Sequence, residues 1–303
     1  MTAHVHSHGS QDAPASHGRA FAIGIALNLA FVVVEAWYGW LAGSLTLLAD
    51  AAHNLSDVGG LVLAWAAYAA AKRAPDDRHT YGWRRGSILA SFANAALLLV
   101  AMGSLAWEAV QRIGSASPVD GLTVMVVAGI GVVVNFGTAW LFMGHRRDLN
   151  IRGAFLHMAA DGLVSVGVVI AGALTLWQGW DWIDPLVSLA VAAVVVLGTW
   201  SLFTRSTHLL FDGVPDELSL VTIRQCLLQL PGVQDVHDLH VWAMSTSDNA
   251  LTAHLVVAPG AAADDVLRAA LEALHHDFGI RHATVQLESA AFAAHCREVS
   301  PPF

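Results

Sequence analysis

Four ionisable residues, arranged as two copies of the pattern His-x-x-x-Asp, carry the strongest chemical signal in the sequence. His53 and Asp57 form the first copy, and His157 and Asp161 form the second. On a helix, residues four apart share one face and lie about 6 Å apart along the axis. Imidazole and carboxylate are ligands that Zn²⁺ accepts in a tetrahedral set of four. Two neutral imidazoles, two carboxylates and one Zn²⁺ also sum to zero charge, so the two copies together predict a zinc site.

The directions of the two helices that carry these copies decide how the side chains meet. The helices are predicted to run antiparallel, so we expect His53 at the level of Asp161 and Asp57 at the level of His157. The alternative is that these polar residues pack helices together or form an ion-pair network. The repetition of one spacing on antiparallel helices favours the metal site.

Other polar residues interrupt the same apolar stretches, where ionisable groups are costly and usually functional. Asp50 lies three residues before His53 and therefore on the same helical stripe. Glu35 lies on the preceding stretch, and for it a proton relay and an interhelical hydrogen bond remain equally open. Asn94 and Asn135 are expected to serve helix packing.

Long apolar helices are needed to carry such residues, and the composition supplies them. Hydrophobic residues make up 55% of the 303 residues, charged residues make up 13%, and the mean hydropathy is +0.55. This is too apolar for a soluble globule. A spanning helix needs about 20 mostly apolar residues. We predict six transmembrane helices, at Ala20–Leu41, Ser44–Ala71, Ser87–Ile113, Val119–Gly144, Gly153–Trp177 and Trp182–Thr204.

Basic residues predict the orientation of these helices, because cytoplasmic loops carry an excess of Lys and Arg. With a cytoplasmic N-terminus, the outer loops hold only Arg112. The inner loops then hold Arg19, Lys72, Arg73, Arg78, Arg84, Arg85, Arg146, Arg147, Arg152 and Arg205. The net charge of −9 argues against nucleic-acid binding. The two cysteines cannot form a disulfide framework, and residues 1–19 have no apolar run typical of a signal peptide.

The composition changes after Arg205, which predicts three domains. Residues 1–19 form a disordered, His-rich cytoplasmic segment, residues 20–205 the transmembrane domain, and residues 206–303 a cytoplasmic α+β domain with 12 acidic and four basic residues. The predicted order in the last domain is αββαβ. Its elements are a helix from a cap at Asp216 to Leu230, strands Val236–Ala243 and Leu251–Val257, a helix Ala263–Phe278 and a strand His282–Glu288.

Several motifs resemble those of the cation diffusion facilitator family, in its zinc-transporting branch. They are Leu48–Asp57 (LADAAHNLSD), Arg152–Asp161 (RGAFLHMAAD), Trp182–Pro185 (WIDP), Asp212–Pro215 (DGVP) and His237–Trp242 (HDLHVW). The resemblance extends from the first predicted helix to Glu288. It implies a homodimeric metal–proton antiporter with six transmembrane helices and a metallochaperone-like cytoplasmic domain, which exports metal from the cytoplasm.

The resemblance also implies metal ligands outside the membrane. His237, His254 and Glu288 match the positions of a cytoplasmic site. On a regularly alternating strand His237 and His240 would face opposite sides, so they are not expected to share an ion. A loop site of some relatives is only partly present, as Asp76, Asp77 and His79, because Trp83 replaces the second His. His4, His6, His8 and His17 give this chain a His-rich N-terminus instead.

The sequence therefore predicts a secondary active transporter in the cell membrane with both termini in the cytoplasm. It would export Zn²⁺, with Co²⁺ or Cd²⁺ as further candidate substrates, in exchange for protons, and zinc could also be a regulatory ligand. The expected partners are a second copy of the chain and the lipid bilayer, with no organic cofactor and no nucleic acid. The alternatives are a membrane metal sensor that signals through the acidic domain, and an intramembrane metalloenzyme. No His-Glu-x-x-His motif supports the latter.

Overall fold

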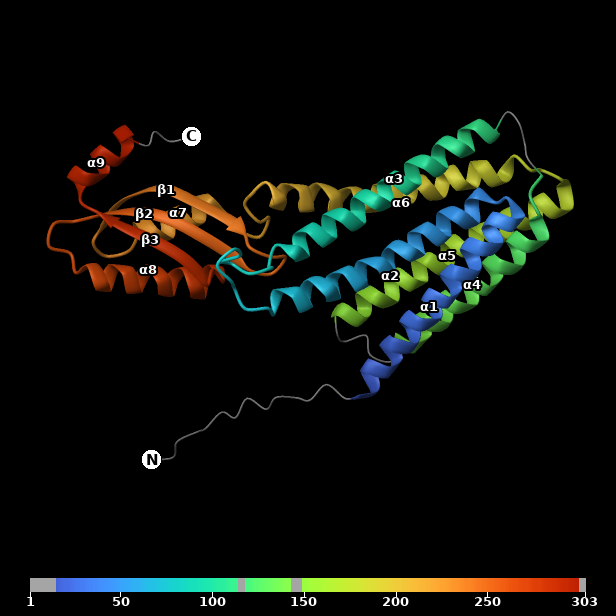
Figure 1. Ribbon diagram of the computed structural model, residues 1–303, viewed down its shortest axis with the longest axis horizontal. Helices are drawn as coiled ribbons and strands as arrows, with labels where there is room; N and C mark the ends of the chain where they lie inside the picture. The colour runs from blue at the N-terminus through green and yellow to red at the C-terminus, as the bar shows by residue number, and fades with distance from the viewer. Residues whose placement is uncertain (1–14, 114–117, 143–148, 300–303) are drawn as a thin grey trace. The chain divides into compact units, whose positions relative to one another are not determined.

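The structure is a computed structural model that describes residues 15–113, 118–142 and 149–299. The predicted His-rich segment up to residue 14 lies outside these residues. Nine helices and three strands follow one another in the described part (Figure 1). They are α1 (Ala15–Ala42), α2 (Leu45–Ala71), α3 (Gly86–Arg112), α4 (Gly121–Phe142), α5 (Leu149–Gln178), α6 (Ile183–Leu210), α7 (Leu220–Leu228), β1 (Val233–Ala243), β2 (Asn249–Val257), α8 (Ala263–Phe278), β3 (His282–Glu288) and α9 (Ala290–Val299).

The helices α1 to α6 occupy the six predicted apolar stretches. By length and composition, α3 to α6 each contain a stretch that can cross a membrane, and the described part of α1 adds a shorter apolar stretch, Ala26–Leu41. These helices bury the carboxyl groups of Glu35 and Asp50 and expose large apolar side chains such as Val133 and Trp177. This inverted burial is typical of helices surrounded by lipid, where apolar side chains face outward without cost.

The described chain divides into two compact units. The first contains residues 1–59 and 97–198, and therefore α1, α4, α5, the first halves of α2 and α6, and the second half of α3. The second contains residues 60–96 and 199–303, and therefore the other halves of α2, α3 and α6 together with the elements from α7 to α9.

In the first unit α4 packs along α5 and against α1. Small residues allow the close approach of α4 and α5: a Cβ atom at Gly121 would lie 2.7 Å from the backbone oxygen of Gly172. Such contacts between backbones are typical of helices that pack inside membranes. The α4–α5 contact fixes the position of α5, which carries Asp161.

Asp184, in the first turn of α6, accepts hydrogen bonds from the start of α2. Its carboxylate accepts from the Ser44 hydroxyl at 2.5 Å, from the backbone amide of Leu45 at 2.8 Å and from that of Thr46 at 3.4 Å. The Thr46 hydroxyl also donates to the backbone oxygen of Asp184 at 2.8 Å. The first amides of a helix have no partner within it, and a carboxylate there also interacts favourably with the helix dipole. Asp184 therefore caps α2 across a sequence separation of about 140 residues.

The second unit contains a three-stranded sheet in the order β1-β2-β3, with α8 running along it (Figure 1). β1 and β2 are antiparallel, whereas β2 and β3 are parallel because α8 forms the crossover between them. One face of the sheet packs on α7 and α8 around Ile223, Val236, Leu255 and Leu274, which are fully buried. The predicted fold class, a helical membrane domain followed by an α+β domain, is confirmed.

Two details of the second unit differ from the prediction. α7 begins later than predicted, because Ser219 caps it by accepting from the amide of Thr222 at 3.3 Å, while Asp216 pairs with Arg205 at 2.9 Å. The order αββαβ is also followed by a further helix, α9, which the sequence pattern did not indicate. Ser289 accepts from the amide of Phe292 at 3.2 Å and so caps its start.

Candidate metal centres

The first candidate centre lies in the first unit, where α2 and α5 bring His53, Asp57 and Asp161 together. The Nε2 atom of His53 is 3.5 Å from Asp161 Oδ1 and 3.8 Å from Asp57 Oδ2. One ligand atom from each residue lies within 4.8 Å of the others. Asp161 is buried, whereas His53 and Asp57 keep 22% and 33% of their side-chain surface exposed. The arrangement offers one nitrogen and two carboxylates to a cation, and the exposed parts of His53 and Asp57 leave the cluster accessible.

His157 lies one helical turn before Asp161 on α5, but its side chain lies outside the described part of the structure. The structure therefore brings together three of the four side chains that the paired motifs single out. Ser165, one turn after Asp161, donates a hydrogen bond of 3.0 Å to the backbone oxygen of Asp161. The same hydroxyl lies 3.5 Å from Asp50 Oδ2, so a second buried carboxylate lies close behind the candidate ligands.

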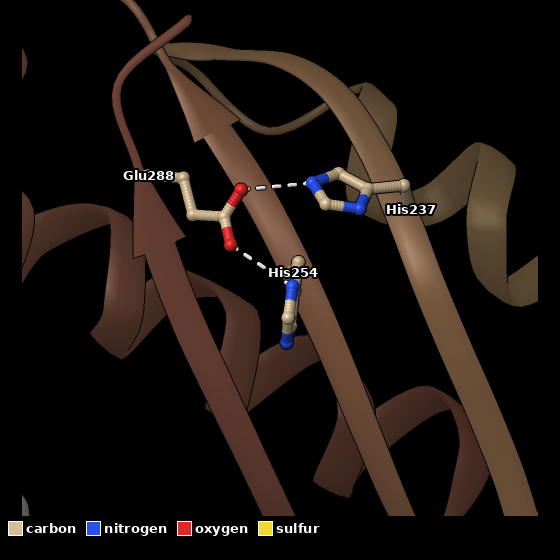
Figure 2. Close-up of side chains that lie close together, drawn as sticks. All are labelled: His237, His254 and Glu288. Atoms are coloured by element: carbon tan, nitrogen blue, oxygen red, sulfur yellow. Dashed lines mark hydrogen bonds and ion pairs between the residues drawn. The ribbon is translucent and has the colours of Figure 1, made fainter. Parts of the chain in front are cut away.

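The second candidate centre lies on the sheet, on the face opposite α7 and α8. His237 on β1, His254 on β2 and Glu288 on β3 point toward one another (Figure 2). Glu288 is buried and contacts both imidazoles at 2.9 Å, with Oε2 near His237 Nε2 and Oε1 near His254 Nδ1. The register of the sheet explains this, because His237 is directly opposite His254 and the end of β3 lies beside β2. Two nitrogens and a carboxylate are ligands that zinc accepts.

A β-bulge changes the neighbourhood of this cluster and overturns one prediction. The register moves three residues along β1, from His237 to His240, but only two along β2, from His254 to Thr252. His240 therefore lies on the same face as His237, not on the opposite one. The reason is the backbone of Asp238, whose φ of 50° lies in the left-handed region that Asp tolerates.

The bulge also brings in Asp238, a residue that the strand pattern did not single out. Its carboxylate lies 3.0 Å from His240 Nε2 and 3.4 Å from His254 Nε2. The hydrogen bond from His240 holds the pKa of Asp238 below its ordinary value, so this carboxylate is ionised over a wide pH range. The sequence gives one indication of this, because Asp238 is an acidic residue between His237 and His240. The alternation of side chains along β1 breaks at this position.

The partial loop site is exposed, and its acidic residue has other partners. Asp76 accepts hydrogen bonds from the backbone amides of Arg78 and His79 at 2.8 and 2.6 Å, and it lies 3.1 Å from His79 Nδ1. These amides lower the pKa of Asp76. The ring of Trp83 lies 4.2 Å from the ring of His79. The contacts of Asp76 are those of a turn cap.

Relatives of this chain align over nearly its whole length. Zinc transporter ZitB of Escherichia coli is 36% identical over 94% of this chain and 92% of its own. The cadmium, cobalt and zinc/H⁺–K⁺ antiporter of Bacillus subtilis is 35% identical over 86% of each chain. The solved metal-bound C-terminal domain of the CzcD transporter of Cupriavidus metallidurans is 33% identical; the match covers 23% of this chain and 99% of that domain, with a TM-score of 0.23.

Two family models cover the two parts of the fold. The cation efflux transmembrane domain matches residues 21–211, and the cytoplasmic domain of cation efflux proteins matches residues 215–290. Together they include both candidate centres, and the resemblance predicted from the paired motifs is confirmed. Relatives at this level of identity are transporters and not enzymes. With its apolar helices and these matches, the chain belongs to the cation efflux family of multi-pass membrane metal transporters.

Proposed function

We propose that this protein exports Zn²⁺ from the cytoplasm in exchange for protons, through a site formed by His53, Asp57, His157 and Asp161. The observation that carries the proposal is the cluster of His53, Asp57 and Asp161 on two packed helices, with ligand atoms within 4.8 Å of one another. His157 would complete the set from the next turn of α5. The names of the relatives support zinc as cargo, with Co²⁺ and Cd²⁺ as further candidates.

Proton exchange follows from the chemistry of the ligands. A metal ion needs neutral imidazole, so a protonated imidazole must lose its proton when zinc binds. Two imidazolium groups beside two carboxylates carry no net charge, as does the same site with neutral imidazoles and Zn²⁺. The site can therefore alternate between the two faces of the membrane without moving net charge through it.

The cytoplasmic domain is proposed to bind zinc through His237, His254 and Glu288 and to join two copies of the chain. With 12 acidic and four basic residues, residues 206–303 have a net charge of −8, which opposes association of two copies. Bound cations would reduce that repulsion. In this arrangement the dimer lies in the cell membrane, and both termini of each chain lie in the cytoplasm. The domain boundaries fall near residues 19 and 205.

The test is zinc flux into proteoliposomes that contain the purified protein, driven by an imposed pH gradient. We expect zinc uptake with proton movement in the opposite direction, and loss of both in Asp57→Ala and in Asp161→Ala. Glu108→Gln is the matched control, because it removes a carboxylate that pairs with Arg112 on its own helix, at 3.0 Å. It should transport zinc at the wild-type rate.

Three outcomes would overturn the proposal in different ways. Wild-type flux in Asp57→Ala or Asp161→Ala would remove that residue from the transport site. A rate of zinc uptake that does not depend on the imposed pH gradient would contradict proton exchange. Zinc binding without any flux would favour the metal sensor over the transporter.

A further inference from the structure

A second buried polar cluster, with no His, lies beside the candidate transport site in the first unit. Glu35 on α1 and Asp50 on α2 have fractional exposures of 0% and 1%, and their carboxyl groups lie close enough to act on each other. Asn54 on α2, Ser165 on α5 and Asn135 on α4 surround them and are also buried. Polar groups from four helices therefore converge on the two carboxyls in an otherwise apolar bundle.

Hydrogen-bond donors in this cluster are too few for two ionised carboxylates. Glu35 Oε2 accepts from the Asn54 amide at 3.3 Å, and Asp50 Oδ2 lies 3.5 Å from a Ser165 hydroxyl that already donates to Asp161 at 3.0 Å. Within the described residues, the other two oxygens, Glu35 Oε1 and Asp50 Oδ1, are buried and have no donor. A buried carboxylate with an unsatisfied oxygen costs several kcal/mol, so the pair needs a further donor or a positive charge.

The contact between the two carboxyls identifies the missing group as a proton. Two carboxylates offer only acceptors, so they repel each other at this closeness unless one of them carries a hydrogen that the other accepts. Two neighbouring carboxyl groups in a medium of low dielectric constant do not both ionise. They share one proton.

We propose that Glu35 and Asp50 form a proton-binding site, separate from the metal ligands, that holds one shared proton when the transport site is empty and releases it when zinc binds. The O–H bond of the shared carboxylic acid breaks, the proton leaves to water, and both carboxylates remain ionised. This inference rests on the proposed function for the release step. The bound proton itself follows from the cluster alone.

The position of the pair explains why zinc would expel its proton. Asp50 is three residues before His53 on α2, and Ser165 lies between Asp50 and the backbone of Asp161. Besides Glu35 on α1, the charged or titratable groups that act on Asp50 are His53 on its own helix and Asp161 on α5. Helix α4 contributes the uncharged Asn135. A divalent cation bound to His53 and Asp161 would place two positive charges within about one helical turn, which favours the ionised pair.

The first measurement is independent of zinc and uses the infrared spectrum of the metal-free, full-length protein. We expect a carbonyl stretch of a protonated carboxylic acid that Glu35→Gln and Asp50→Asn each remove, because one carboxylate facing an amide no longer needs a proton. Asp184→Asn is the control: Asp184 is also buried, but its carboxylate accepts hydrogen bonds from Ser44, Leu45 and Thr46 and therefore has the donors that the pair lacks. A stretch that survives both variants of the pair would overturn the proton site.

The second measurement counts the protons released per zinc ion. It uses titration calorimetry in buffers of different ionisation enthalpy, in a His237→Ala/His254→Ala background that lacks the cytoplasmic ligands. We expect about one proton fewer per zinc in Glu35→Gln than in that background alone, and no change in Asp184→Asn. Equal proton release in Glu35→Gln and its parent would overturn the release step. Loss of zinc binding in the parent would instead contradict the proposed transport site, and the infrared result would still decide whether the pair holds a proton.

Discussion

The two candidate metal centres use the same kinds of ligand, yet strands and helices hold the ligand atoms at different distances. On the sheet, Glu288 contacts both imidazoles at 2.9 Å, whereas on the helices the His53 nitrogen is 3.5 and 3.8 Å from its two carboxylates. Backbone hydrogen bonds keep neighbouring strands about 4.8 Å apart, while packed helices lie about 8–10 Å apart and are held by side chains. We therefore expect the strand-borne cluster to keep its shape without metal, and the helix-borne cluster to tighten around an ion and relax again.

The largest expected effect separates the two centres by transport rate. Asp161→Ala removes a buried carboxylate from the helix-borne cluster and should lower the saturated zinc flux by more than about 100-fold. Loss of a group that only hydrogen-bonds to a metal ligand already lowers metal affinity or activity by about 10- to 100-fold, and loss of the ligand itself should lower it at least as much. Glu288→Gln removes the carboxylate shared by both imidazoles on the sheet and should leave the saturated flux within about twofold of wild type. Zinc flux in proteoliposomes at saturating zinc measures both variants.

Equal losses of flux in these two variants would break the comparison, because the sheet cluster would then belong to the transport path. The amount of folded protein in each variant, checked by size-exclusion chromatography, serves as the control.

The second prediction concerns the stability of the cytoplasmic part alone. Residues 206–303 include the sheet, α7 and α8 around their own apolar core, so this segment is expected to fold by itself and to be stabilised by zinc. At a hundredfold excess of zinc over Kd, binding to the folded form adds about 2.7 kcal/mol to the free energy of unfolding. The change in melting temperature with zinc concentration measures this effect.

The control for that shift is the double variant His237→Ala/His254→Ala, which keeps His275 and His276 on α8. An equal zinc-induced shift in the double variant would mean that zinc binds elsewhere on the domain. We expect the shift to fall to a small fraction of its wild-type size.

The third prediction sharpens the comparison through metal selectivity. His53→Asp replaces the only nitrogen ligand among the described residues of the helix-borne cluster with oxygen and adds a negative charge. Imidazole suits zinc, and an oxygen-rich site accepts a broader range of cations. We expect cadmium flux to rise relative to zinc flux in a competition assay. If the ratio of the two fluxes does not change, His53 does not determine selectivity.

The smallest expected effect concerns Asp238, which lies 3.4 Å from His254 Nε2. Asp238→Asn keeps the size of the side chain and removes its charge. We expect the zinc-induced gain in stability of the isolated domain to fall by about 1 kcal/mol, the scale of one ordinary hydrogen bond. A zinc-induced shift in melting temperature equal to that of the wild type would show that the bulge carries no part of the metal site.

Local periodicity predicted much of the fold, and it failed where contacts or backbone geometry are not periodic. The helix Ala263–Phe278 and the strand His282–Glu288 were predicted to the residue, because an amphipathic helix and an alternating strand each leave a complete pattern. The face of His240 was predicted wrongly, because alternation assumes a strand without a bulge, and a positive φ at Asp238 breaks it.

The same reasoning explains which parts of the candidate sites the sequence could indicate. The spacing of His53 and Asp57 lies within one helix and is visible in the sequence, whereas the approach of Glu35 to Asp50 depends on how two helices pack. The sequence alone allows either a proton relay or an interhelical hydrogen bond for Glu35, and the structure adds the geometry of its contact with Asn54. The role of Asp184 as a cap for α2 had no local signal, because its partners are about 140 residues away.

That cap has a consequence for the order in which the chain is synthesised. The ribosome makes α2 well before α6. The amides of Leu45 and Thr46 therefore have no Asp184 carboxylate to donate to until about 140 more residues have been synthesised. Until then the amino end of α2 must stay hydrated or find a temporary partner, since unsatisfied amides are costly in hydrocarbon. The ends of α2 and α6 that carry this contact are therefore expected to come together last during biogenesis. A chain that stops after α5 should be a substrate for membrane proteases, which pulse-chase labelling of a truncated chain would measure.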